Sequence, residues 1–200
     1  MLISFEGIDG CGKSTQIELL KNRLLSESQT VAVFREPGGT DVSEQIRGIL
    51  LNPEIELDSV TELLLFSSAR SQLIASRVKP MLKENQIVIL DRFYDSTTAY
   101  QGYGRNSLPI EEIHLLNSIA SHHIEPDITF YLKIDLSTSE DRRKAFTKDR
   151  MEQSGKDFFE KVIEGYNKLA SEFDRFVTLD ATKAPDVIHQ QIWEKITPHF

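Results

Sequence analysis

Cysteine is nearly absent from this sequence: Cys11 is the only one in 200 residues. A single cysteine excludes a disulfide within the chain and a zinc site built from several thiolates. Long apolar runs are also lacking, since the longest, such as Leu63–Phe66, have four residues, whereas a membrane-spanning helix needs about 20. Glu6 and Asp9 interrupt the first apolar stretch. We therefore expect no signal peptide, no membrane contact and a cytoplasmic location.

Basic residues are outnumbered: 23 lysines and arginines face 31 aspartates and glutamates, for a formal net charge of −8. Binding to nucleic acid or to an anionic membrane generally requires a basic surface, so this balance argues against both partners. It leaves room for small phosphorylated ligands, which need only a local cluster of positive charge. Neither a repeat nor a linker interrupts the chain, and its length suits one domain over residues 1–200.

Short β-rich runs alternate with longer amphipathic segments, which predicts an α/β fold with a five-stranded parallel sheet flanked by helices. The strands are mostly continuous apolar runs, as expected when helices cover both faces of a sheet. We predict strands at Leu2–Glu6, Val31–Arg35, Ile87–Asp91, Ile128–Ile134 and Phe176–Asp180. Helices are predicted at Ser14–Leu25, from a cap at Asp41, at Thr61–Leu82, from Pro109 to Ser121, at Asp157–Phe173 and at Pro185–Ile196.

The most informative motif is a phosphate-binding loop of the pattern G-x-x-x-x-G-K-[ST], which lies between a predicted strand and a predicted helix. Glycines allow the backbone to curl so that successive N–H groups point at phosphate oxygens, and the helix that follows adds the positive end of its dipole. Lysine and serine at its end suit phosphate and Mg²⁺. The residues expected to bind ATP are Gly7, Ile8, Asp9, Gly10, Cys11, Gly12, Lys13, Ser14 and Thr15.

Charged residues also follow other predicted strands. Ile87–Asp91 ends four apolar residues with an aspartate, the pattern of a strand whose carboxylate orients Mg²⁺. Arg92 comes next, and Arg35 ends the second strand. Ligands of such sheets bind at the carboxyl ends of the strands, so we expect Asp9, Arg35, Asp91 and Arg92 to meet in one crevice.

Several further runs resemble the thymidylate kinases, a branch of the P-loop nucleoside monophosphate kinases. Besides the phosphate loop, the similarity rests on Arg35–Thr40, Leu65–Arg70, Asp91–Phe93, Ser96–Gly102, Pro126-Asp127 and Leu179–Ala181. It covers nearly the whole chain. The resemblance implies a homodimeric enzyme that uses Mg²⁺ and ATP to phosphorylate dTMP to dTDP.

The resemblance also implies roles for individual residues. Phe66 should stack on thymine and Arg70 should hydrogen-bond the base, and a spacing of four places both on one helix face. The expected dTMP-binding residues are Asp9, Arg35, Phe66, Arg70, Arg92, Ser96, Thr97, Tyr100 and Gln101, with Tyr100 against the sugar. The expected metal-site residues are Ser14, Asp9 and Asp91, and the expected catalytic residues are Lys13, Asp9, Arg92, Arg143 and Arg150.

Residues 137–155 resemble the family's lid, a segment that closes over ATP. Its basic candidates are Arg142, Arg143, Lys148 and Arg150; we favour Arg150 as catalytic and place Arg143 nearer the adenine, with Lys183. The lid of bacterial members often alternates Arg and Ala. This chain departs from that pattern with Ala145 and Phe146. The resemblance associates Gly10 with the bacterial type, because the eukaryotic type has a basic residue there.

Two other functions are compatible with a phosphate loop. One is a kinase for another nucleoside monophosphate, a deoxynucleoside or a small metabolite, although Arg35 and Arg92 favour a phosphorylated acceptor. The other is a nucleotide-dependent switch that binds a protein partner. The guanine-reading Asn-Lys-x-Asp run of GTPases is absent from the sequence.

Overall fold

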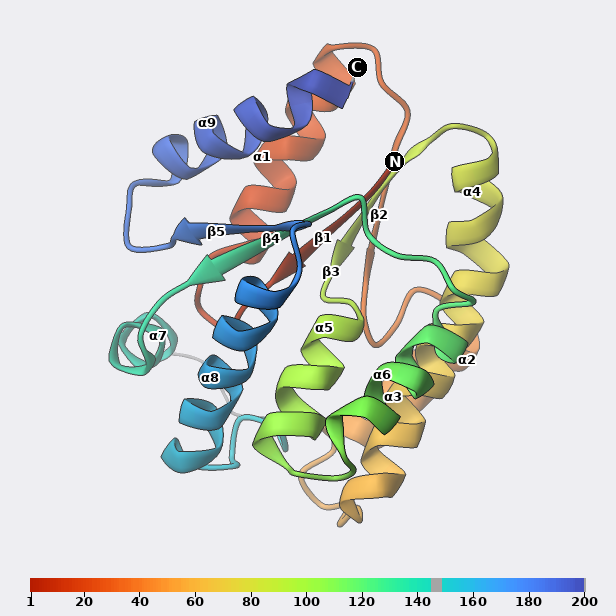
Figure 1. Ribbon diagram of the computed structural model, residues 1–200, viewed down its shortest axis with the longest axis vertical. Helices are drawn as coiled ribbons and strands as arrows, with labels where there is room; N and C mark the ends of the chain where they lie inside the picture. Colours follow the sequence, from red (N-terminus) through yellow and green to blue (C-terminus); the bar gives the residue numbers. More distant parts are fainter. Residues whose placement is uncertain (145–148, 200) are drawn as a thin grey trace.

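The computed structural model describes residues 1–144 and 149–199. Its five strands form one parallel sheet in the order β2-β3-β1-β4-β5 (Figure 1). The strands are β1 Leu2–Glu6, β2 Val31–Arg35, β3 Ile87–Asp91, β4 Ile128–Lys133 and β5 Phe176–Asp180. The predicted α/β class and parallel sheet are confirmed, and four of the five strands have the predicted bounds. Because β1 is central, its carboxyl end opens at the middle of the sheet edge.

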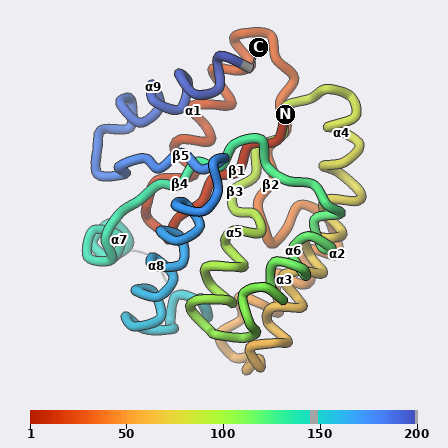
Figure 2. Tube along the Cα trace, in the orientation of Figure 1, coloured from red at the N-terminus to blue at the C-terminus, as the bar shows by residue number. Residues whose placement is uncertain are grey.

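Helices cover both faces of the sheet. In Figures 1 and 2, α1 and α9 lie side by side on one face, while α5 and α8 lie on the other. No helix in the described parts of the chain is long and apolar enough to cross a membrane. The helices are α1 Lys13–Ser26, α2 Asp41–Leu51, α3 Ser59–Leu73, α4 Lys79–Lys83, α5 Tyr94–Thr97, α6 Ile110–Ala120, α7 Leu136–Arg143, α8 Lys156–Glu172 and α9 Pro185–Ile196, with π-helical turns at Ile74–Val78 and Thr98–Gly104 and a 3₁₀ turn at Thr197–His199.

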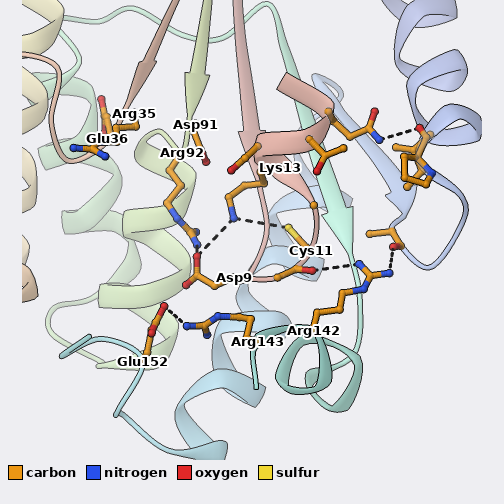
Figure 3. Close-up of a pocket in the computed structure, with 18 of the residues that line it drawn as sticks. Asp9, Cys11, Lys13, Arg35, Glu36, Asp91, Arg92, Arg142, Arg143 and Glu152 are labelled. Atoms are coloured by element: carbon orange, nitrogen blue, oxygen red, sulfur yellow. Dashed lines mark hydrogen bonds and ion pairs between the residues drawn. The ribbon is translucent and has the colours of Figure 1, made fainter. Parts of the chain in front are cut away.

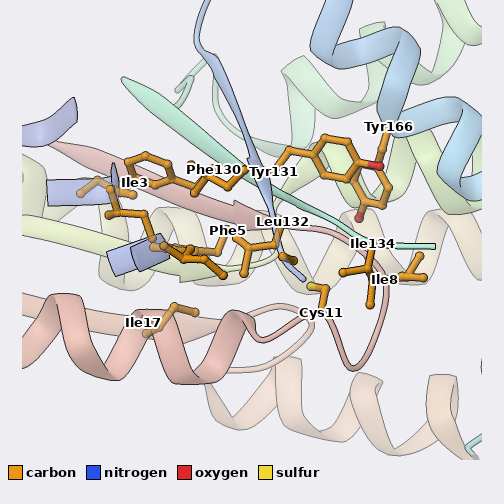
Figure 4. Packing of buried hydrophobic residues seen from close by; sticks show 14 of the residues in the cluster. Ile3, Phe5, Ile8, Cys11, Ile17, Phe130, Tyr131, Leu132, Ile134 and Tyr166 are labelled. Atoms are coloured by element: carbon orange, nitrogen blue, oxygen red, sulfur yellow. The ribbon is translucent and has the colours of Figure 1, made fainter. Parts of the chain in front are cut away.

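The central strand β1 and its neighbour β4 supply much of the core. Phe5 of β1 and Phe130 of β4 are fully buried, with ring centroids 5.3 Å apart. Tyr131 stacks on Tyr166 of α8 at 5.1 Å, and Figure 4 shows these rings on one side of the sheet, with Cys11 beneath its other side. Each such aromatic side chain stabilises the fold by about 1.5–3 kcal/mol. This packing holds the loop after β1 against a rigid sheet.

The helix over residues 94–104 was not predicted from the sequence. Two glycines in it weaken the helical signal, but tertiary packing requires them. A Cβ on Gly102 would lie 2.9 Å from Ile110 Cδ1, and one on Gly104 would lie 2.6 Å from a ring carbon of Phe158. The helix is therefore stabilised by close contact with α6 and α8 rather than by local propensity.

The cap predicted at Asp41 is wrong by one residue. Thr40 is the N-cap of α2, and its hydroxyl accepts a hydrogen bond from the Ser43 N–H at 3.1 Å. Both residue types cap helices well, so local preference alone did not choose between them. The long helix predicted at Thr61–Leu82 forms as α3, a π-helical turn and α4 in direct succession.

Candidate active site

The turn between β1 and α1 is Gly7–Gly12, because α1 begins at Lys13, one residue before the start predicted from the sequence. Gly7, Gly10 and Gly12 have φ angles of 135°, 77° and 99°, which side-chain-bearing residues rarely adopt. A Cβ on Gly7 would also lie 2.6 Å from the carbonyl oxygen of Leu132. The loop can therefore curl tightly enough for its N–H groups, with the N-terminus of α1, to form an anion-binding site.

Lys13 is folded back onto this loop. Its Nζ donates to the carbonyl oxygens of Gly7 at 3.1 Å and Ile8 at 3.3 Å, and lies 3.9 Å from Asp9 Oδ1. Gly7 and Ile8 thus lie behind the site and orient the lysine. The Lys13 side chain is 7% exposed and lines the cavity in front of the loop. A buried cation held this way is well placed to attract phosphate oxygens.

Arg92 and Asp9 form an ion pair at the carboxyl ends of β3 and β1 (Figure 3). Arg92 Nη2 lies 2.6 Å from Asp9 Oδ1, while Nη1 donates to the Gly7 carbonyl oxygen at 2.9 Å. Burial alone would raise the pKa of Asp9, but the charges of Arg92 and Lys13 outweigh it and hold that pKa well below its ordinary value. Asp9 is therefore a carboxylate at neutral pH and acts as an acceptor.

A cavity of about 800 Å³ opens in front of the loop. Arg35, which also lines it, has a side chain 56% exposed and pairs with Glu44 at 3.0 Å. The cavity therefore collects cations and a phosphate loop around one space. Of the residues predicted for ATP, metal or phosphate, those that line it are Asp9, Gly10, Cys11, Gly12, Lys13, Ser14, Thr15, Arg35, Asp91, Arg92, Arg143 and Lys183.

The oxygen donors in this cavity suit magnesium. Ser14 offers a hydroxyl, and Asp9 and Asp91 offer carboxylates, all of them hard oxygen ligands. Within residues 1–144 and 149–199, no group of three His, Cys, Asp or Glu side chains forms a ready cage for a metal. Mg²⁺ commonly keeps several waters and shares phosphate ligands with few carboxylates. The residues present therefore fit a magnesium ion that arrives with a nucleotide.

A second, smaller cavity of about 110 Å³ adjoins the first. We call it the base cavity, after the base pocket that the sequence predicted. Phe66 and Arg70 of α3 both line it, so the structure brings the two residues of the predicted base pocket to one space. With them, the predicted residues that line it are Asp9, Arg92, Ser96, Thr97, Tyr100 and Gln101. Of the predicted dTMP-binding set, only Arg35 lines the large cavity alone.

Arg70 is held in place by three acceptors. Its Nε donates to Glu36 Oε2 at 2.8 Å, Nη1 to Asn117 Oδ1 at 3.1 Å and Nη2 to Thr97 Oγ1 at 2.8 Å. The side chain is 2% exposed. Burial raises the pKa of Glu36 to about 7, and the charge of Arg70 offsets only part of that rise. A guanidinium carries five N–H groups, so these three acceptors leave two of them unused on a side chain that lines the base cavity.

The lid candidates separate into two groups. Arg143 lines the large cavity and pairs with Glu152, and Arg142 donates to the carbonyl oxygens of Gly10 and Ala181 at 3.2 and 2.9 Å. A Cβ on Gly10 would lie 3.0 Å from Arg143 Cγ. The Arg143 side chain therefore occupies the space that a side chain at position 10 would need.

Arg150 lies elsewhere: its Nη2 is 2.6 Å from Glu62 Oε2, and its Nε donates to the Leu50 carbonyl oxygen at 2.7 Å. It lines neither the large cavity nor the base cavity. The structure therefore brings Arg143 and Arg142, but not Arg150, to the phosphate loop. Lys148 lies outside the described residues.

Sequence reasoning missed Glu6, the residue that holds the turn after Arg92. Glu6 is fully buried and accepts hydrogen bonds from the Phe93 N–H at 2.7 Å, the Ser96 hydroxyl at 2.5 Å and the Tyr166 hydroxyl at 3.0 Å. Burial raises its pKa to about 7, with a further rise from the charge of Asp95. Because Tyr166 is 160 residues away, no local pattern could have revealed this network.

Arg47 was also missed. It lines both cavities and donates to the Pro37 carbonyl oxygen at 2.9 Å. A signal existed: Arg47 is the only basic residue of α2, the helix that follows the Arg35–Thr40 run.

Comparisons with known proteins agree with this arrangement. A family model described as thymidylate kinase matches residues 5–192. A thymidylate kinase of Prosthecochloris aestuarii is 48% identical over 209 residues, covering 98% of this chain and 92% of the relative. One of Thermoanaerobacter sp. strain X514 is 46% identical over 99% and 98% of the two chains, and one of Fervidobacterium nodosum is 45% identical over 96% of each.

Proposed function

Since the chain belongs to the thymidylate kinase family, we propose from that premise which of its residues carry the reaction. The reaction is transfer of the γ-phosphoryl group of ATP to dTMP, which yields dTDP and ADP. The observation that carries the assignment is that the two cavities meet. Asp9, Glu36, Arg47 and Arg92 line both of them. A nucleotide in each cavity would place two phosphate chains against the same arginines.

Charge is the main obstacle, because two polyanions must approach each other. We assign Lys13 and the loop N–H groups to the phosphates of ATP, and Arg35 and Arg92 to the phosphate of dTMP. Preorganised cations stabilise the charge of the transferring group in the transition state. The second pKa of a phosphate monoester is about 6, so the dTMP phosphate is mostly dianionic at pH 7. No general base is therefore required, and the protein's work is alignment.

Magnesium is the expected companion of ATP in this site. Ser14 would hold it directly, with Asp9 and Asp91 as further oxygen donors, as their shared cavity supports. When bound, Mg²⁺ neutralises charge on the phosphate oxygens.

The base cavity suits a deoxyribonucleotide with thymine. Phe66 offers an aromatic face, and Arg70 offers N–H donors. We assign Ser96, Thr97 and Gln101 to its edge and Asp9 to the sugar 3′-hydroxyl. Tyr100 would occupy the space of a 2′-hydroxyl. Since one methyl group in an apolar pocket contributes only about 1–3 kcal/mol, dUMP is expected to react weakly.

In the lid, the positions support Arg143 rather than Arg150 as the arginine that reaches the transferring phosphoryl group, with Arg142 and Lys183 nearer the adenine. Arg143 lines the large cavity opposite Lys13 (Figure 3). Closure of residues 137–155 would exclude water from the site.

We also propose a homodimer and a cytoplasmic location. Exposed apolar side chains lie on three neighbouring helices: Val42 and Ile49 on α2, Leu64 on α3, and Leu115 and Ile119 on α6. Exposed apolar side chains that gather on neighbouring helices mark a protein–protein interface more often than scattered ones do. The location follows from the substrates, which are charged nucleotides that do not cross membranes unaided.

The proposal is tested by measuring ADP release with Mg·ATP and dTMP, dUMP, UMP, CMP, dCMP, AMP, GMP or thymidine as the acceptor. We expect strong turnover with dTMP, weak turnover with dUMP and none with thymidine, and we expect EDTA to abolish it. Preference for another monophosphate would overturn the base-pocket assignment. No acceleration by any acceptor would overturn the kinase assignment and favour a nucleotide-dependent switch.

A further inference from the structure

Glu62 is a buried carboxylate that contacts Gln101 in the lining of the base cavity, and none of the roles assigned above uses it. It lies on α3, one helical turn before Phe66, and its side chain is 1% exposed. Oε2 lies 2.6 Å from Arg150 Nη2, and Oε1 lies 3.3 Å from Arg105 Nε. Two guanidinium groups offset the cost of burying this charge. A carboxylate in such a position only accepts hydrogen bonds.

The remaining partner of Glu62 is Gln101, which lines the base cavity. Gln101 Nε2 donates to Glu62 Oε1 at 2.9 Å, and the Gln101 side chain is itself 1% exposed. A glutamine amide has one donor end and one acceptor end. Because a carboxylate cannot donate, the NH₂ end of Gln101 must face Glu62. The carbonyl oxygen is then the end that the amide offers to a ligand.

The cavity thus presents a defined pattern of hydrogen-bonding groups. Arg70 supplies N–H donors, since its other three are held by Glu36, Asn117 and Thr97. Gln101 supplies an acceptor. Thymine and uracil carry a donor at N3 beside an acceptor at O4, which matches this pattern. Cytosine carries an acceptor at N3 and an amino group at C4, which opposes it at both positions.

We propose that Glu62 is a positioning residue that fixes the orientation of the Gln101 amide and thereby makes the pocket select a base with a proton on N3. The inference rests on the proposed function, because it takes dTMP as the acceptor. Glu62 acts through Gln101 and does not touch the nucleotide. Sites that hydrogen-bond one specific group reject an analogue that lacks it more strongly than apolar pockets reject an extra methyl.

The test compares kcat/KM for dTMP and dCMP in the wild type, Glu62→Gln and Arg105→Met. A glutamine at 62 can offer either end of its amide, so Gln101 is free to turn. We expect the dTMP/dCMP ratio to fall at least about tenfold in Glu62→Gln, through a higher KM for dTMP with kcat largely kept. Arg105→Met removes another contact of the same carboxylate but leaves Glu62 and Gln101, so its ratio should match the wild type.

An unchanged ratio in folded Glu62→Gln, or an equal fall in Arg105→Met, would overturn the inference. If Glu62→Gln does not fold, Gln101→Met removes the amide whose orientation Glu62 is proposed to fix. A dTMP/dCMP ratio at least about tenfold below that of the wild type supports the inference, and an unchanged ratio overturns it. A wild type that is inactive on dTMP but active on another nucleotide would instead overturn the proposed function from which the inference starts.

Discussion

Arg92 Nη2 lies 2.6 Å from Asp9 Oδ1, which joins the residue after β3 to the phosphate loop after β1. Arg92 has a φ angle of 70°, a left-handed conformation that a bulky residue seldom adopts without support. Glu6 supports it, because its buried carboxylate accepts a hydrogen bond from the N–H of Phe93, the residue that follows Arg92. Contacts within the protein alone therefore hold the Arg92 guanidinium in place.

Replacement of Asp9 tests this pair. Asp9→Asn keeps the shape of the side chain but removes the charge that faces Arg92 and Lys13 and weakens the acceptor proposed for the 3′-hydroxyl. We expect kcat/KM for dTMP to fall about 10- to 100-fold, since a hydrogen bond to a charged group contributes about 1.5–3 kcal/mol. Steady-state kinetics measure the change, and Asp41→Asn on the exposed start of α2 is the control. Wild-type kinetics in Asp9→Asn would contradict the assignment.

The two lid arginines should differ in their effects. Arg143→Met removes a cation from the large cavity. We expect kcat to fall at least about 100-fold, the size of loss seen when a group that stabilises a transferring phosphoryl group is removed. Arg150→Met removes one of the two guanidinium partners of buried Glu62, so its larger effect should be a lower Tm. Calorimetry and kcat at saturating substrates separate the two. Lys144→Met, whose side chain is 77% exposed, is the matched control; a larger loss of kcat in Arg150→Met would restore the sequence-based choice.

Tyr100 is proposed to exclude a 2′-hydroxyl by its bulk. Its ring lies under the Arg92 guanidinium, 5.1 Å from Cζ to the centroid, and it lines the base cavity. Tyr100→Ala should therefore narrow the preference for dTMP over ribothymidine monophosphate by about tenfold or more. Tyr100→Phe keeps the ring and should keep the preference. If both variants discriminate like the wild type, another side chain faces C2′.

Glu36 should make stability depend on pH. Burial raises its pKa from the ordinary value of 4.5 to about 7, so the folded state binds more protons than the unfolded state between these values. Its contribution to the unfolding free energy is therefore fully present below about pH 4.5 and is lost as the pH rises through about 7. Glu36→Gln removes this dependence. Urea titrations across that range should show the wild type losing stability relative to the variant, and a constant difference would contradict the pKa.

The apolar patch on α2, α3 and α6 should control assembly. Leu115 is 64% exposed, and a charged side chain at this position would be buried in a dimer. We expect Leu115→Glu to sediment as a monomer under conditions where the wild type is a dimer. Val187→Glu on α9, 48% exposed in the wild type, is the control and should not alter the sedimentation coefficient. A wild-type monomer at all concentrations would disprove the homodimer.

The sequence by itself determined the sheet and the outline of the site. Solid apolar runs mark strands that are covered on both faces, and the charges that end them had to meet, because the carboxyl ends of parallel strands share one edge. The glycine spacing in Gly7–Gly12 predicted the phosphate loop for a local reason, because glycine adopts the positive φ angles that such a turn requires. Phe66 and Arg70 share a cavity because residues four apart lie on one helix face.

Only the tertiary structure decided what those patterns leave open. The helix over residues 94–104 depends on contacts with α6 and α8 that its glycines make possible, and local propensity opposes it. The partners of Glu6 and Glu62 lie roughly 40 to 160 residues away along the chain. Both buried carboxylates fix the orientation of neighbouring side chains by accepting their hydrogen bonds. The sequence shows which cations the lid carries; the packed chain shows that Arg143 points to the phosphate loop while Arg150 is held by Glu62.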